Sequence, residues 1–216
     1  MAKTEHYYTK FEEGKFYHVY NRSTDKEPLF RNEGNYEFFL KQYDFYLSPV
    51  VETFAYCLLG NHFHLLIKIK NLAGLDIESL QKIPDYQNPH TSHQKTTHDI
   101  VCHQLRKFFQ SYSMAFNKQH QRIGALFQKP YKRALVDTDA YFMQLVYYIH
   151  FNPQHHHLID DFREWKWSSY KRILINRPSK LNKEQVLQWF TGKDNFIQYH
   201  AEIQKIAAKE IMLDDD

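Results

Sequence analysis

The stretch that decides the fold is Glu52–Lys70, ETFAYCLLGNHFHLLIKIK. Two runs rich in aromatic and aliphatic residues flank a Gly60-Asn61 pair, which is typical of a β-hairpin. Side chains alternate across a strand, so every second residue of the latter run shares one face. That face is predicted to carry four residues, His62, His64, Leu66 and Lys68.

Hydrophobic periodicity and chain breakers predict five further elements around this hairpin. They are a strand at Lys15–Arg22, a helix at about 32–47, a helix at about 99–120, a strand within 125–136 and a helix at about 137–152. Pro153 is expected to stop the last helix, and Pro130 to mark an edge strand or a bulge. The order predicts an α+β domain with an antiparallel sheet, helices on one face, and a ferredoxin-like or RRM-like topology.

Composition narrows the class of protein. The chain has 216 residues, 43% of them hydrophobic, with only six Gly and seven Pro, which excludes collagen-like, disulfide-framework and disordered classes. No run approaches the roughly 18 apolar residues of a membrane-spanning helix, and the N-terminal stretch lacks the apolar core of a signal peptide. A soluble, cytoplasmic protein is therefore expected. The net charge of +3 does not by itself indicate a nucleic-acid binder.

His62 and His64 are the first candidates for chemistry. Two imidazoles on one strand face can converge on one cation. Spacing alone is weak evidence, because the chain holds fourteen His and one such pair is expected by chance. The alternative is a partly buried pair satisfied by hydrogen bonds. The Gly-Asn turn, the hydrophobic strand and Lys68 on the same face favour the site.

The end of the 137–152 helix is the second candidate. Tyr148 and Asn152 are four residues apart and so lie one turn apart on one helix face. A tyrosine hydroxyl can act as a nucleophile, and an amide oxygen can bind a hard cation. The alternative is that the tyrosines are packing residues and that Asn before Pro is an ordinary helix exit.

Four segments in this order carry a family resemblance. Gly60–Ile67 resembles the metal-binding strand of the HUH single-strand nucleases, and more narrowly that of the small tyrosine transposases, including those associated with repetitive extragenic palindromes. Leu126–Lys132 resembles the strand before the last helix of that family. Tyr141–Pro153 resembles its tyrosine helix, with the pattern Tyr-Ile-x-x-Asn-Pro, and Trp165–Tyr170 resembles its Trp-Ser-Ser-Tyr signature. The resemblance covers about residues 15–173.

The resemblance implies specific roles. Tyr148 would be the nucleophile, since Ile149 and the Asn-Pro pair follow it at the family spacing, which excludes Tyr147. His62, His64 and Asn152 would bind Mg²⁺ or Mn²⁺. The chain would be a transposase-like endonuclease whose partner is hairpin-forming single-stranded DNA. It would cleave this DNA through a 5′-phosphotyrosine intermediate and rejoin it to a 3′-OH. A homodimer is a further expectation, because some relatives exchange the tyrosine helix between subunits.

The implied domain spans residues 1–176, with a flexible loop at about 82–96, and a C-terminal helical extension covers 177–216. The loop, the extension and Lys166, where a proline is common, are departures from the family pattern. Local positive charge would hold the DNA backbone. The candidate residues in segments flanking the site are Lys68, Lys70, Arg106, Lys107, Lys129, Lys132 and Arg133.

Two other readings stay open. A non-catalytic RRM-like nucleic-acid-binding module would place no joint demand on the histidines and Tyr148, and a water-using metallohydrolase would need the histidines alone. No general base is identified, although His18 and His150 are candidates. The Trp165–Tyr170 segment would contact DNA or, as its density of aromatics favours, pack against the domain.

Overall fold

The computed structural model describes residues 9–73 and 96–210 of the chain. The predicted loop at 82–96 therefore lies, except for Thr96, outside the described residues. Four strands form one sheet in the order β2-β3-β1-β4, and each neighbouring pair is antiparallel. The strands are β1 (Phe16–Arg22), β2 (Val51–Leu58), β3 (His62–Ile69) and β4 (Lys132–Val136).

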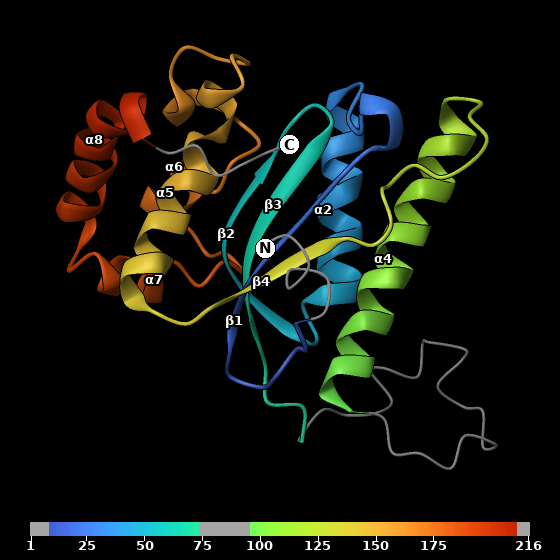
Figure 1. Cartoon of the computed structure of the whole chain (residues 1–216), viewed down its shortest axis with the longest axis horizontal. Coiled ribbons are helices and arrows are strands. Elements are labelled where there is room, and N and C mark those ends of the chain that lie inside the picture. The colour runs from blue at the N-terminus through green and yellow to red at the C-terminus, as the bar shows by residue number, and fades with distance from the viewer. Residues whose placement is uncertain (1–8, 74–95, 211–216) are drawn as a thin grey trace.

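The helices α2 (Glu33–Leu47) and α4 (Thr97–Gln119) alternate with the strands in the order β1, α2, β2, β3, α4, β4. This order and the strand arrangement are those of a ferredoxin-like fold, as the sequence predicted. Asn32 caps α2 by accepting from the amide of Asn35, and Thr96 begins α4 with a reciprocal capping box. Both helices lie on the same side of the sheet (Figure 1).

The expectation that all helices lie on one face is wrong. Helix α5 (Asp139–His155) covers the opposite face and contacts β2 and β3 (Figure 1). The reason lies in β3, in which seven of eight residues are buried, so that both of its faces need a cover. On one side Phe63 meets Phe39 of α2, with ring centroids 5.1 Å apart. On the other side His64 meets Tyr148 of α5.

The expectation that Pro153 stops this helix is also wrong, because α5 continues to His155 with the proline inside it. Proline removes one backbone donor, but it sits close to the helix end, where few hydrogen bonds depend on it. The amide of His156 still donates to the carbonyl of Asn152, and the amide of Leu158 to that of Pro153. Asn152 therefore stays on the helix instead of marking its exit.

Further helices follow α5 and lie on the side of it that faces away from the sheet. They are η3 (Phe162–Glu164), α6 (Tyr170–Leu174), α7 (Lys183–Trp189) and α8 (Lys193–Glu210), and a further turn, η1 (Thr24–Lys26), follows β1. Trp189 stacks on Phe142 of α5 with centroids 4.0 Å apart. His150 of α5 bonds His200 of α8 at 3.0 Å and Ser169 at 2.8 Å, all three buried. These contacts hold α5 in place on the side that faces away from the sheet.

In the described ranges, no helix combines the length and apolar character that crossing a membrane requires.

Candidate active site

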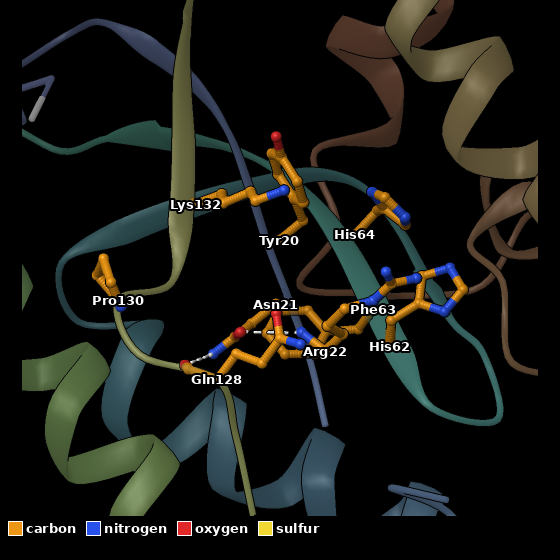
Figure 2. A pocket seen from close by; sticks show the side chains of 9 residues that line it. All are labelled: Tyr20, Asn21, Arg22, His62, Phe63, His64, Gln128, Pro130 and Lys132. Atoms are coloured by element: carbon orange, nitrogen blue, oxygen red, sulfur yellow. Dashed lines mark hydrogen bonds between the residues drawn. The ribbon is translucent and has the colours of Figure 1, made fainter. Parts of the chain in front are cut away.

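The two candidate histidines lie at the start of β3, an inner strand of the sheet, and His64 is on the face that α5 covers. The register of β3 against β1 sets Tyr20 opposite His64 and Arg22 opposite His62. Directly opposed residues of antiparallel strands share a face. A hollow beside the histidines is lined by these four residues together with Asn21, Phe63, Gln128, Pro130 and Lys132 (Figure 2).

Each imidazole is held through its Nδ1 atom. His62 Nδ1 lies 2.7 Å from Oδ1 of Asn61, an acceptor, so Nδ1 carries the proton. His64 Nδ1 lies 2.9 Å from Nε2 of His18. The Nε2 atom of His64 is buried and makes no hydrogen bond to the described residues. Holding one ring nitrogen in this way orients the other, which is how metal-binding histidines are positioned in proteins.

The protonation state of His64 suits a metal ligand. Burial, reinforced by the neighbouring charges of His18, His62 and His156, holds the pKa of His64 well below its usual range. The ring is therefore neutral at neutral pH, and a neutral imidazole is the form that binds a metal ion.

Helix α5 brings Tyr148 to the same place. The Tyr148 ring meets His64 edge-on with centroids 5.4 Å apart, and it meets His18 at 6.2 Å. One turn later, Asn152 Nδ2 donates to the carbonyl of Tyr148 at 2.8 Å. This bond turns Asn152 Oδ1 the other way, where it is buried and makes no hydrogen bond to the described residues.

Tyr147, one residue earlier, points elsewhere. Its ring stacks on Phe151 with centroids 5.3 Å apart and lies 5.6 Å from His200. Burial raises the pKa of its hydroxyl above the usual range. The structure thus separates the two adjacent tyrosines, with Tyr148 against the histidines and Tyr147 against the C-terminal helices.

Imidazole nitrogens and an amide oxygen are groups that can bind a divalent cation. Within the described part of the chain, no group of three or more His, Cys, Asp and Glu side chains is arranged to hold a metal. A site here would therefore need the Asn152 amide oxygen beside the two imidazole nitrogens. Burying two such polar atoms without hydrogen bonds, as in His64 and Asn152, costs free energy that a bound cation would offset. His156 follows on the next turn and meets His62 edge-on at 4.8 Å.

The predicted basic residues are scattered. Lys132 lines the hollow, with its ammonium 5.6 Å from the Tyr20 ring centroid (Figure 2). Arg106 and Lys129 line a neighbouring groove. The others lie away from both: Lys68 is over Phe16, Lys70 donates to the carbonyl of Ser48, Arg133 donates to that of Thr9, and Lys107 is half-buried on α4.

The sequence predicts no role in holding the histidines for several residues that contact them. His18 is predicted only as a candidate general base, and in the structure its Nε2 atom contacts Nδ1 of His64, an arrangement that can orient that imidazole. Arg22 and Tyr20 continue the alternation of β1 from His18, which is the one signal that could have indicated their face. Asn61 adjoins the histidines in the turn, where its side chain can reach back to hold His62.

Two other candidates have structural partners. His150 is fully buried between Ser169 and His200, and burial lowers its pKa well below the usual range. It does not reach the hollow. The Trp165–Tyr170 segment packs as favoured: Trp167 stacks on Tyr36 with centroids 4.4 Å apart, and Trp165 Nε1 donates to the carbonyl of Leu58.

Comparisons with known proteins point to one fold. No family model matches the chain, and no curated protein matches it significantly. Among solved structures, the chain is similar to a REP-associated tyrosine transposase bound to a REP hairpin. The match has a TM-score of 0.55 and 13% sequence identity, and covers 79% of this chain and 86% of the other. The chain thus shares its α+β fold with a REP-associated tyrosine transposase.

Proposed function

We propose that this chain is a metal-dependent single-stranded DNA endonuclease and strand transferase that uses Tyr148 as its nucleophile. The observation that carries the proposal is the meeting of two elements far apart in sequence. Strand β3 supplies His64, whose buried Nε2 makes no hydrogen bond to the described residues, and α5 supplies Tyr148 and the buried Oδ1 of Asn152. The fold shared with a transposase that binds a DNA hairpin supports the same substrate class.

The reaction would be a phosphoryl transfer to a phenol. The Tyr148 oxygen attacks the scissile phosphorus and loses its proton, while the bond from phosphorus to the 3′ oxygen breaks. The products are a 5′-phosphotyrosine and a DNA strand that ends in a 3′-OH. Attack of a 3′-OH on the phosphotyrosine reverses these bond changes, so rejoining needs no ATP, because the phosphoryl bond is kept in the covalent adduct.

His62, His64 and Asn152 would hold Mg²⁺ or Mn²⁺, which when bound polarises the scissile phosphate and offsets the charge on its oxygens. Asn152 has a second task, because its Nδ2 bond to the Tyr148 carbonyl keeps nucleophile and ligand in one arrangement. Arg22 and Lys132 line the hollow and would neutralise backbone phosphates on either side of the reacting one.

The test is a covalent adduct. Labelled hairpin DNA with single-stranded flanks is incubated with the protein and Mn²⁺ and then resolved under denaturing conditions. We expect an adduct with the wild type and none with Tyr148→Phe. Tyr147→Phe and Tyr20→Phe are matched controls, since each removes one hydroxyl, the first from the adjacent position of α5 and the second from the hollow itself. Both should keep the adduct.

Other results would assign other functions. Cleavage that survives Tyr148→Phe would indicate a hydrolase that activates water. If Tyr20→Phe lost the adduct and Tyr148→Phe kept it, the nucleophile would be Tyr20 of β1. Binding without cleavage by the wild type, across several hairpins and both metals, would indicate a non-catalytic nucleic-acid-binding module.

A further inference from the structure

A large groove lies next to the candidate active site, between α4 and the segment 124–131 that leads into β4. Its volume is about 720 Å³, within the ~300–1,000 Å³ range of sites for drug-sized ligands, a class that includes a nucleotide. Neither the metal site nor the nucleophile uses it. Nothing in the proposed chemistry therefore accounts for its shape.

The groove has flat aromatic walls. Phe109 of α4 is only half-buried, and its ring lies 5.0 Å from that of Phe127 and 5.5 Å from that of Tyr131. All three residues line the groove. A partly exposed aromatic face is the surface on which an unpaired base stacks, because every base has a π-face to offer.

Amide side chains supply hydrogen-bonding groups at the same place. Gln110 and Gln128 line the groove from opposite walls, both are exposed, and neither side-chain amide bonds to any residue of the described ranges. An amide offers a donor and an acceptor side by side, which matches the edge of a nucleobase. Two such groups beside aromatic rings can distinguish one base from another.

Charge and position both favour DNA as the occupant. Arg106 and Lys129 line the groove, and neither it nor the hollow beside the histidines has a carboxylate in its lining. The two linings share Asn21, Gln128 and Pro130, so the groove continues directly from the candidate active site. Asn21 and Gln128 are themselves tied together, since Asn21 Nδ2 donates to the Gln128 carbonyl (Figure 2).

We propose that this groove binds an unpaired nucleotide of the DNA strand next to the cleavage point and reads its base. Phe109 and Tyr131 stack on the base, Gln110 and Gln128 bond its edge, and Arg106 and Lys129 contact the flanking phosphates. The inference rests on the proposed function, because it assumes that the strand passes the histidine pair. It adds a source of sequence specificity separate from the groups that perform the chemistry.

The test selects DNA by binding in the absence of divalent metal, so that no cleavage intervenes. The probe is a pool of stem–loop oligonucleotides with roughly eight randomised nucleotides on each side of the stem, a span within the site sizes of single-strand binders. Bound molecules are sequenced for the wild type and for the double variant Gln110→Ala/Gln128→Ala. Gln188→Ala, an exposed glutamine on α7, is the matched control.

We expect the wild type to select a base at one or more flanking positions. The double variant should lose that preference at one or two of them, with affinity reduced about tenfold at most, while Gln188→Ala changes nothing. An abasic nucleotide at the same position should weaken wild-type binding by about tenfold or more, the size of one base–aromatic stack. Phe109→Leu should remove this sensitivity, and Phe45→Leu, which alters an exposed aromatic of α2, should not.

An unchanged preference in the double variant, or none in the wild type, would overturn the inference. It would also be overturned if Met114→Asp, at the exposed rim of the groove, altered the oligomeric mass but not DNA binding, because the groove would then seat a second copy. If the double variant forms the adduct and keeps the base preference of the wild type, the proposed role of the groove is refuted and the proposed nucleophile is not. Altered preference without any adduct in the wild type would refute the proposed nucleophile alone.

Discussion

His18 offers the sharpest test of how the metal site is held. Its Nε2 atom lies 2.9 Å from Nδ1 of His64, and its ring centroid lies 4.5 Å from that of Tyr20 and 5.1 Å from that of His64, which are 5.6 Å from each other. The substitution His18→Phe keeps an aromatic ring at this position and removes both imidazole nitrogens, including the Nε2 atom that contacts His64. We expect the metal affinity of the protein to fall.

The expected size follows from the role. Removing a group that orients a metal ligand costs about 10–100-fold in metal affinity, or ~1.4–2.7 kcal/mol. The variant also leaves His64 Nδ1 buried without a partner, which lowers the free energy of unfolding by about 1–3 kcal/mol. The two losses are separable, since the first depends on the metal and the second does not.

The assay is a titration with Mn²⁺, read by electron paramagnetic resonance and by the Mn²⁺ concentration that gives half-maximal adduct. The melting temperature without metal reports the loss of stability. His18→Gln restores a polar atom at the position and should recover part of the affinity. Tyr20→Phe, which keeps the stack and changes only a hydroxyl, is the control and should bind Mn²⁺ as the wild type does.

One result would refute this reasoning. If His18→Phe bound Mn²⁺ as tightly as the wild type while its melting temperature fell, the contact with His64 would stabilise the sheet but would not orient a ligand. If His18→Gln recovered none of the lost Mn²⁺ affinity, the affinity would depend on the imidazole ring of His18 and not on a polar atom at that position.

Three further outcomes are expected. Asn152→Ala should abolish the adduct by removing both the ligand oxygen and the bond to the nucleophile's carbonyl, whereas Asn152→Asp keeps an oxygen ligand and should retain Mn²⁺ binding, measured by the same titration. Lys132→Ala should lower the slope of log affinity against log salt by about 0.7, the value for one phosphate on single-stranded DNA, while Lys70→Ala, whose ammonium already bonds a backbone carbonyl, should not change it. Burial lowers the pKa of His200 to about 4 and holds the pKa of His150 well below its usual range, so the unfolded chain takes up protons below about pH 6.5 that the folded chain does not. The free energy of unfolding should therefore fall by ~1.4 kcal/mol per pH unit for each group as the pH drops toward 4, and urea titrations of His200→Phe should show a shallower fall.

The spacing of residues along the sequence predicts part of the candidate site. Alternation along a strand puts His62 and His64 on one face whatever surrounds them, and the four-residue spacing puts Tyr148 and Asn152 on one side of a helix. Both relations hold in the structure. Each depends only on residues within one element, so each can be read from the sequence.

Relations between elements could not be read in this way. The contact of His18 with His64 depends on the register of β1 against β3. Neither strand's own sequence predicts that register. The prediction at Pro153 failed for a local reason, since a proline in the last turn removes a donor on which few helical hydrogen bonds depend, and α5 continues to His155. The charges of Lys70 and Arg133 looked available for DNA, yet both side chains bond carbonyls of the chain itself.

The different orientations of Tyr147 and Tyr148 have a consequence for the number of DNA ends that one chain can hold. Successive residues of a helix point about 100° apart, so α5 turns one phenol toward the histidines and the other toward α8. Under the proposed mechanism one copy then holds one DNA end at a time. Exchange between two broken ends must either proceed in turn at a single tyrosine or bring two copies together, and the number of adducts per chain distinguishes these routes.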